Sequence, residues 1–180
     1  MNTSPDHTTI NVNPGRETMM KAIFVTLLAA ASLMSATVAA NAAGTHEGGH
    51  YEFGEPGKAE NVTKTVLVDA VDENGEMRFV HEPLTIKQGD VVKFVVTNRG
   101  TMPHEFSVGD SPSQRAHALM MEKMPDMKHE NDATAITLEP GETKELIWAF
   151  TKPIKGQIEL ACQMPGHYAG GMVTKVRMVK

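Results

Sequence analysis

The chain has 180 residues, of which 41% are hydrophobic, and a formal net charge of −5 at pH 7. This composition disfavours nucleic acid as a partner, because no basic block is present to neutralise phosphates. It also excludes a disulfide framework, since the sequence contains one cysteine and a single thiol has no partner within its own chain.

The N-terminal segment has the features of a secretory signal peptide. From Met19 onward, a lysine is followed by an uncharged apolar run and then by small residues, with an A-x-A cleavage pattern at residues 40–42. Residues 1–18 fit no positively charged n-region, so Met19 or Met20 is the better start. We therefore predict a signal peptide over residues 1–42, export to the periplasm and no stable membrane insertion.

The next segment, residues 43–62, predicts a flexible leader. It is rich in glycine and charged residues and shows no apolar period. The chain beyond it is long enough for one domain with one core. We place that domain at residues 63–180.

Short β-prone runs separated by turn signals follow the leader. Apolar and polar residues alternate within these runs, which indicates strands with one face toward a core. We expect eight strands, at residues 63–71, 75–80, 90–98, 104–108, 134–138, 143–150, 156–162 and 172–179. This pattern predicts an all-β antiparallel sandwich or barrel. Within it, Cys162 ends a core-facing row that begins with Ile158 and Leu160.

One segment, residues 112–131, interrupts the strands with helix formers and methionines. It predicts a short helix at about 113–123 that Pro125 ends. Two sets of soft side chains recur in it at helical spacing: Met120, Met124 and Met127, and His117, Met121 and Met124. Thioethers and an imidazole could thus share a face of the helix. The alternative is that the helix packs its methionines on the sandwich.

A soft ligand set lies near the C-terminus, where Cys162, His167 and Met172 follow one another at five-residue intervals with Pro and Gly turns between them. In an oxidising compartment a free thiol is a liability unless it is buried or bound to a partner. Thiolate, imidazole and thioether together suit copper, although a trigonal His2Cys set needs a second histidine. The candidate is His104, which begins a predicted strand after a glycine-containing turn.

The segments TNRGTMPHEF and CQMPGHYAGGM, in this order, resemble those of the cupredoxins, the azurin and plastocyanin family of small copper proteins. The resemblance runs from about Thr63 to Lys180, and the Cys-x4-His-x4-Met spacing is similar to the azurin loop. It implies a Greek-key β-sandwich with one type 1 site that holds Cu(I) or Cu(II). The implied ligands are His104, Cys162 and His167 in the equatorial plane and Met172 in the axial position. Glu105 departs from the family pattern, which often has an asparagine here that ties two loops together.

Within the family, the leader and the methionine-rich insert resemble those of the periplasmic copper-tolerance cupredoxins of the CopI type. His46 and His50 of the leader are then candidates for an auxiliary copper site, although the glycines between them disfavour a helix. A cut after Ala43 would instead place His46 third in the mature chain, where a square-planar Cu(II) site could form. Met102 and Met164, beside the implied ligands, are expected to form an apolar rim that controls solvent access.

The resemblance implies a copper-tolerance protein that sequesters copper or handles its redox state, and not an enzyme. No open coordination position for a substrate is expected, and the sequence has no G-x-S-x-G motif and no P-loop. One alternative is an electron shuttle between respiratory partners, with His167 as the edge that faces a redox partner protein. Another is a fragment of a copper oxidase or nitrite reductase, which would need further copper centres. The copper stoichiometry separates tolerance from shuttling.

Overall fold

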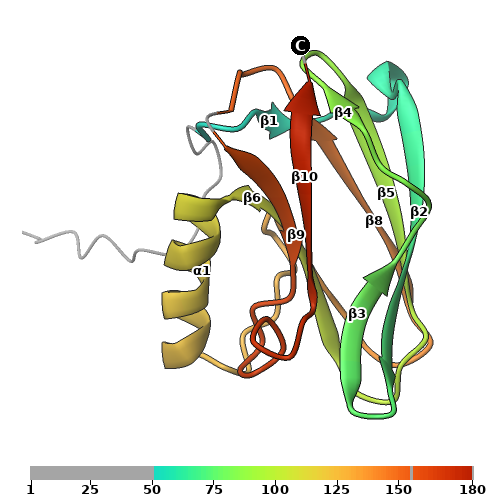
Figure 1. Cartoon of the computed structure of the whole chain (residues 1–180), viewed down its shortest axis with the longest axis vertical. Helices are drawn as coiled ribbons and strands as arrows, with labels where there is room; N and C mark the ends of the chain where they lie inside the picture. Colours follow the sequence, from blue (N-terminus) through green and yellow to red (C-terminus); the bar gives the residue numbers. More distant parts are fainter. Residues whose placement is uncertain (1–50, 155, 180) are drawn as a thin grey trace, which may run out of the picture. The chain divides into compact units, whose positions relative to one another are not determined.

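The computed structural model describes residues 51–154 and 156–179, which form two five-stranded sheets packed face to face with one helix on the outside (Figure 1). The predicted signal peptide and the leader histidines His46 and His50 lie outside the described residues. The elements are β1 (Glu55–Pro56), the 3-10 helix η1 (Ala59–Asn61), β2 (Lys64–Glu73), β3 (Glu76–Val80), β4 (Ile86–Lys87), β5 (Val91–Asn98), β6 (His104–Asp110), α1 (Ser111–Lys123), β7 (Ala135–Leu138), β8 (Thr143–Ala149), β9 (Gln157–Ala161) and β10 (Val173–Val179).

The predicted β-sandwich is confirmed, with strand order β1-β8-β5-β2-β3 in one sheet and β4-β10-β9-β6-β7 in the other. The eight predicted strands are all present, and β1 and β4 are additional. These two were missed because a two-residue strand carries no alternation to detect. Most neighbours are antiparallel as predicted, but β2 runs parallel to β5 and β4 runs parallel to β10. A parallel pair needs a crossover, and the chain makes one by passing through β3 and β4 between β2 and β5.

The core lies between the two sheets and is built from the inward-facing residues of each strand. Phe106 of β6 contacts Phe94 of β5 at a ring-centroid distance of 5.2 Å, which joins the two sheets. The predicted row of Ile158, Leu160 and Cys162 faces this core, and all three side chains are fully buried. The core therefore fixes the ends of β6 and β9, from which two of the predicted ligands extend.

Helix α1 begins at Ser111, two residues before the predicted start, because Asp110 caps it by accepting a hydrogen bond from the Ser113 amide at 2.9 Å. It covers the outer face of β6 and β9 (Figure 1), so both faces of β9 are buried. Met121 of the predicted methionine face is fully buried, whereas Met124 is 44% exposed. The helix thus packs Met121 on the sandwich and points Met124 to solvent. Among the described residues, no helix is both long and apolar enough to span a bilayer.

The predicted flexible leader is wrong for residues 51–62. Phe53 is 2% exposed and stacks on Trp148 at a centroid distance of 4.8 Å, and β1 pairs with the end of β8. Gly54 has a φ of 139°, and a Cβ there would lie 2.1 Å from the Ala149 carbonyl oxygen, so only glycine fits. Two aromatic residues, Tyr51 and Phe53, anchor this segment on Trp148, and two such residues produce no apolar period in a sequence.

Candidate metal centre

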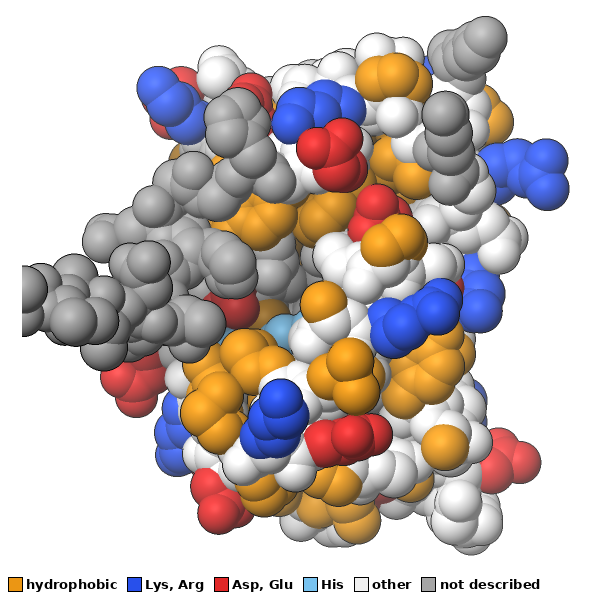
Figure 2. Space-filling model, turned by 90° about the vertical axis from the view of Figure 1, so that its left-hand side faces the viewer, with side chains coloured by type: hydrophobic (Ala, Val, Ile, Leu, Met, Phe, Trp, Pro, Cys, Tyr) orange, Lys and Arg blue, Asp and Glu red, His pale blue; other side chains and the backbone are white. Residues whose placement is uncertain are grey.

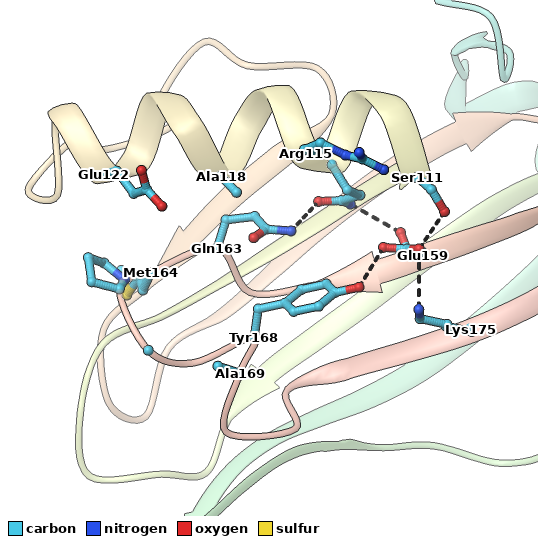
Figure 3. Close-up of a pocket in the computed structure, with 13 residues that line it drawn as sticks. Ser111, Arg115, Ala118, Glu122, Glu159, Gln163, Met164, Tyr168, Ala169 and Lys175 are labelled. Carbon is cyan, nitrogen blue, oxygen red and sulfur yellow. Dashed lines mark hydrogen bonds and ion pairs between the residues drawn. The ribbon is translucent and has the colours of Figure 1, made fainter.

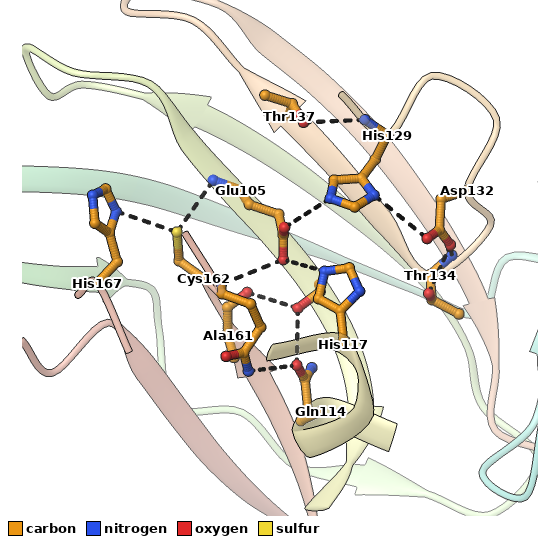
Figure 4. A network of polar contacts seen from close by, with 12 residues as sticks. Glu105, Gln114, His117, His129, Asp132, Thr134, Thr137, Ala161, Cys162 and His167 are labelled. Carbon is orange, nitrogen blue, oxygen red and sulfur yellow. Dashed lines mark hydrogen bonds and ion pairs between the residues drawn. The ribbon is translucent and has the colours of Figure 1, made fainter. Parts of the chain in front are cut away.

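Three of the four predicted ligands converge at one end of the sandwich. His104 is the first residue of β6, Cys162 follows the last residue of β9, and His167 lies in the loop between β9 and β10. Their ligand atoms all lie within 4.8 Å of one another. His167 Nδ1 is 3.2 Å from His104 Nδ1 and 3.3 Å from Cys162 Sγ, the latter contact drawn in Figure 4. The structure brings these side chains together as predicted, and their binding of a metal stays a prediction.

The fourth predicted ligand, Met172, is fully buried in the core cluster. Its amide donates to the His167 carbonyl at 3.0 Å, and its carbonyl accepts from the Cys162 amide at 3.1 Å. Both ends of the loop that carries Cys162 and His167 are therefore tied to the backbone of Met172. An axial role for its thioether stays a prediction.

His104 is oriented by a carboxylate that sequence reasoning missed. Its Nε2 lies 3.2 Å from Asp72 Oδ2, and the Asp72 carboxylate also accepts from the backbone amides of Thr101 at 2.8 Å and Met102 at 3.0 Å. With Nε2 facing Asp72, the other ring nitrogen faces His167, which is how carboxylates commonly orient metal-binding histidines. Asp72 gave no signal in the sequence because acidic residues are common next to turns such as the one that follows β2.

The protonation states of the three side chains are set mainly by burial. Burial and the neighbouring His167 lower the pKa of His104, and burial lowers the pKa of His167, so both imidazoles are neutral at pH 7 and able to bind a metal. Burial and the Glu105 carboxylate raise the pKa of Cys162 to about 12. A metal that binds here must therefore displace the thiol proton.

The turn before His104 is held by Asn98, which is 1% exposed. Its side-chain amide donates to the carbonyls of Met102 at 2.9 Å and Leu138 at 3.0 Å, and its side-chain oxygen accepts from the Gly100 amide at 2.8 Å. These bonds fix the path of the chain into β6, and with it the position of His104.

Glu105 connects the two segments that carry the ligands, although it replaces the asparagine of the family pattern. Its amide donates to Cys162 Sγ at 3.3 Å, and its carboxylate accepts from the Gln163 amide at 3.4 Å (Figure 4). The carboxylate is fully buried, and burial alone would raise its pKa. The contacts with His117 and His129 outweigh burial and lower the pKa of Glu105 to about 2. The substitution therefore keeps the connection and adds a buried negative charge.

The loop between β9 and β10 is also anchored to the layer beneath α1 (Figure 3). Tyr168 donates its hydroxyl to Glu159 at 3.0 Å, and Gln163 donates its side-chain amide to Gln114 of α1 at 2.9 Å. These residues line an open pocket of about 620 Å³ between α1 and the loop. Anchors on both sides hold the loop in one conformation.

The side chains around the proposed ligands form a partly apolar surface. Met102 is 41% exposed, and Met164 is partly buried against the core, while their role as an apolar rim stays a prediction. Figure 2 shows the face of the molecule on which α1 lies, where hydrophobic side chains gather beside charged ones. The ligand atoms of His104 and Cys162 are fully buried, so water has little access to them.

Comparisons with known proteins agree with this arrangement. The profile of copper-binding proteins of the plastocyanin/azurin family matches residues 65–179. The chain is similar to a protein of Rubrivivax gelatinosus named copper-resistant cuproprotein CopI, at 39% identity over 159 residues that cover 83% of this chain and 93% of the relative. A protein of the same name from Vibrio cholerae serotype O1 is 38% identical over 130 residues, which cover 72% of this chain and 74% of the relative.

Two solved structures share the fold. The structure of auracyanin B matches with a TM-score of 0.55 and 21% identity, over 71% of this chain and 96% of that one. Reduced auracyanin from Roseiflexus castenholzii matches with a TM-score of 0.53 and 19% identity, over 66% of this chain and 99% of the auracyanin chain. The predicted fold class is thereby confirmed.

Proposed function

Because the chain belongs to the plastocyanin/azurin family of copper-binding proteins, we propose that it binds copper through His104, Cys162 and His167 and serves in copper tolerance. The observation that carries this proposal is the convergence of one thiol and two imidazoles within 4.8 Å, although His104 lies far from Cys162 and His167 in the sequence. Both curated relatives described above are named copper-resistant cuproproteins, which supports tolerance as the role.

The donor set fits copper. A thiolate with two imidazoles is the trigonal set of type 1 copper, and burial keeps both imidazoles neutral. Bound copper would supply a centre for transfer of one electron. Asp72 orients His104, the Glu105 amide donates to the sulfur of Cys162, and Met172 is the proposed axial ligand. The ligand residues His104 and Cys162 are fully buried, which supports a role in binding copper and not in catalysis.

We further propose that the chain acts in the periplasm, to which the predicted signal peptide at residues 1–42 would direct it. An electron shuttle is the second candidate function. It is favoured by His167, which is only half-buried in a loop whose tip, Pro165 and Gly166, is exposed. A redox partner protein could therefore approach this ligand.

The visible spectrum of the Cu(II)-loaded protein tests the copper site. We expect intense thiolate-to-copper absorption in the wild type and its loss in Cys162→Ser. His104→Gln should also lose this absorption. His81→Gln is the matched control, because the His81 ring contacts Glu82 and Thr174 and lies outside the site. Absorption that survives in Cys162→Ser would refute the proposal.

Growth on copper separates the two functions. In a strain that lacks the protein, the wild type should restore growth at high copper and Cys162→Ser should not. If the protein is an electron shuttle, the strain with the wild type and the strain with Cys162→Ser should tolerate copper equally. The rate of respiration should then be lower in the strain with Cys162→Ser.

A further inference from the structure

A second group of potential metal ligands lies beside the proposed copper site. We define the Glu105 cluster as Glu105 of β6, His117 of α1 and His129 of the segment between α1 and β7. Their ligand atoms lie within 4.8 Å of one another. Glu105 Oε1 is 3.0 Å from His117 Nε2, and Glu105 Oε2 is 2.9 Å from His129 Nε2. Figure 4 shows the carboxylate between the two rings.

The cluster is buried, and its contacts have the distances of ion pairs between a carboxylate and two histidines. The side chains of Glu105 and His129 are fully buried, and that of His117 is 12% exposed. Despite the short distances, Glu105 Oε2 and the Nε2 atoms of both histidines lack a hydrogen-bond partner of acceptable geometry. A buried polar atom without a partner is costly, and the cost disappears if the atom binds an ion. The ring nitrogens of His104 and His167, 3.2 Å apart, are crowded in the same manner around the proposed copper position.

The surrounding residues hold the cluster in place. His129 Nδ1 lies 3.5 Å from Asp132 Oδ2, so Asp132 faces the ring nitrogen that points away from Glu105. The His129 amide donates to Thr137 of β7 at 3.3 Å. The contact between Asp132 and His129 resembles the contact between Asp72 and His104. Contacts of this kind orient histidines toward metals.

We propose that the Glu105 cluster is a second metal site, which binds a divalent first-row transition ion and holds Cu(II) most tightly. Two imidazoles and a carboxylate suit Cu(II) and Zn(II), and affinity in such sites rises toward Cu(II). None of these three donors is a thiolate, so the site differs in kind from the one at Cys162. This site goes beyond the proposed function, because it does not require that His104 and Cys162 bind copper.

The two sites share one strand. His104 and Glu105 are consecutive in β6, and successive side chains of a strand point to opposite faces. The two ions would thus lie on opposite sides of β6. Because the Glu105 amide also donates to Cys162 Sγ, an ion on the carboxylate is linked to the sulfur through a single residue. Filling the second site should therefore shift the thiolate-to-copper absorption slightly.

The test measures bound copper and its electron paramagnetic resonance after loading the full chain with Cu(II) and removing excess ion. All variants carry His46→Gln and His50→Gln, so that the leader histidines do not contribute. We expect a signal without thiolate character, coupled to two imidazole nitrogens, beside that of the Cys162 site. His117→Gln and His129→Gln should each remove this signal or weaken its copper affinity roughly tenfold or more. His81→Gln should keep it.

Two further outcomes decide the proposal. The signal must survive in Cys162→Ser, which separates the second site from the proposed copper site. If the signal is absent in the background chain, or unchanged in both His117→Gln and His129→Gln, the proposal is overturned. His117→Gln is the safer variant to fold, since the His117 side chain is partly exposed, and an unchanged circular dichroism spectrum shows that the variant has folded.

Discussion

The two groups of ligand side chains meet at the peptide bond between His104 and Glu105 but differ in how the chain assembles them. The Cys162 group takes two of its members from one short loop, whereas the Glu105 cluster takes each member from a different element. In the first group a local spacing fixes Cys162 and His167, whereas the second group depends on how α1 and the segment after it pack against the sheet. Potential metal ligands can therefore be brought together by a turn or by the packing of distant elements. Only ligands on a turn produce a motif that can be recognised in the sequence.

The largest effect is expected for Glu105→Ala, which removes the residue that both groups share. The change removes the carboxylate that faces His117 and His129 in a buried region, and the Gln163 amide loses its acceptor. Breaking one side of a buried charged pair costs about 3–5 kcal/mol, so unfolding of the metal-free protein by urea should show a loss of this size. Glu145→Ala is the control, since Glu145 pairs with Lys93 at the surface and should cost less than about 1 kcal/mol. If Glu105→Ala and Glu145→Ala lowered the free energy of unfolding equally, the Glu105 cluster would add nothing to stability.

Asp72→Asn should weaken only the Cys162 group. The amide cannot support the His104 ring as a carboxylate does, and removing such a contact lowers metal affinity about 10- to 100-fold. Competition with a chromophoric chelator measures this affinity. The matched control is Asp69→Asn, because Asp69 forms an exposed ion pair with Arg99. If the Glu105 cluster lost copper to the same extent, the two groups would not be independent.

Asn98→Ala tests the turn that precedes both groups. Three hydrogen bonds are lost, and the carbonyls of Met102 and Leu138 lose a buried donor, at a cost of about 1–3 kcal/mol. Because the turn leads directly into His104, the copper absorption should broaden, while the signal of the Glu105 cluster should stay sharp. A broadened signal at both sites would mean that the turn positions β6 as a whole.

The smallest effect on stability is expected for Met172→Leu. Leucine fills a similar volume, so the free energy of unfolding should fall by less than about 1.5 kcal/mol. Loss of a thioether donor should raise the reduction potential of the copper, because the axial ligand stabilises Cu(II). Met121→Leu is the control at an equally buried position of α1, and it should leave the potential unchanged. The same result in both variants would argue against an axial role for Met172.

The sequence predicted the long strands and the Cys162 group because both depend on short-range regularity. Strand alternation predicted that Cys162 faces the core, and the family motif supplied His104, which lies 58 positions earlier in the chain. Asp72 and His129 were not predicted. Neither lies in a motif, and each reaches its histidine or carboxylate partner only through the packing of separate elements. The prediction for residues 51–62 failed for a similar reason, since Tyr51 and Phe53 pack on Trp148, which lies far along the chain.

The pairing of β1 with β8 has a consequence for solubility. An unpaired strand at the edge of a sheet offers its amides and carbonyls to other chains, and proteins protect such edges from aggregation. Here the short β1 covers the end of β8 at Trp148 and Ala149, while Phe53 covers the indole ring. Proteolytic trimming that removed the chain before Gly57 would leave the ligand residues intact but expose that edge, and the shortened protein would tend to self-associate.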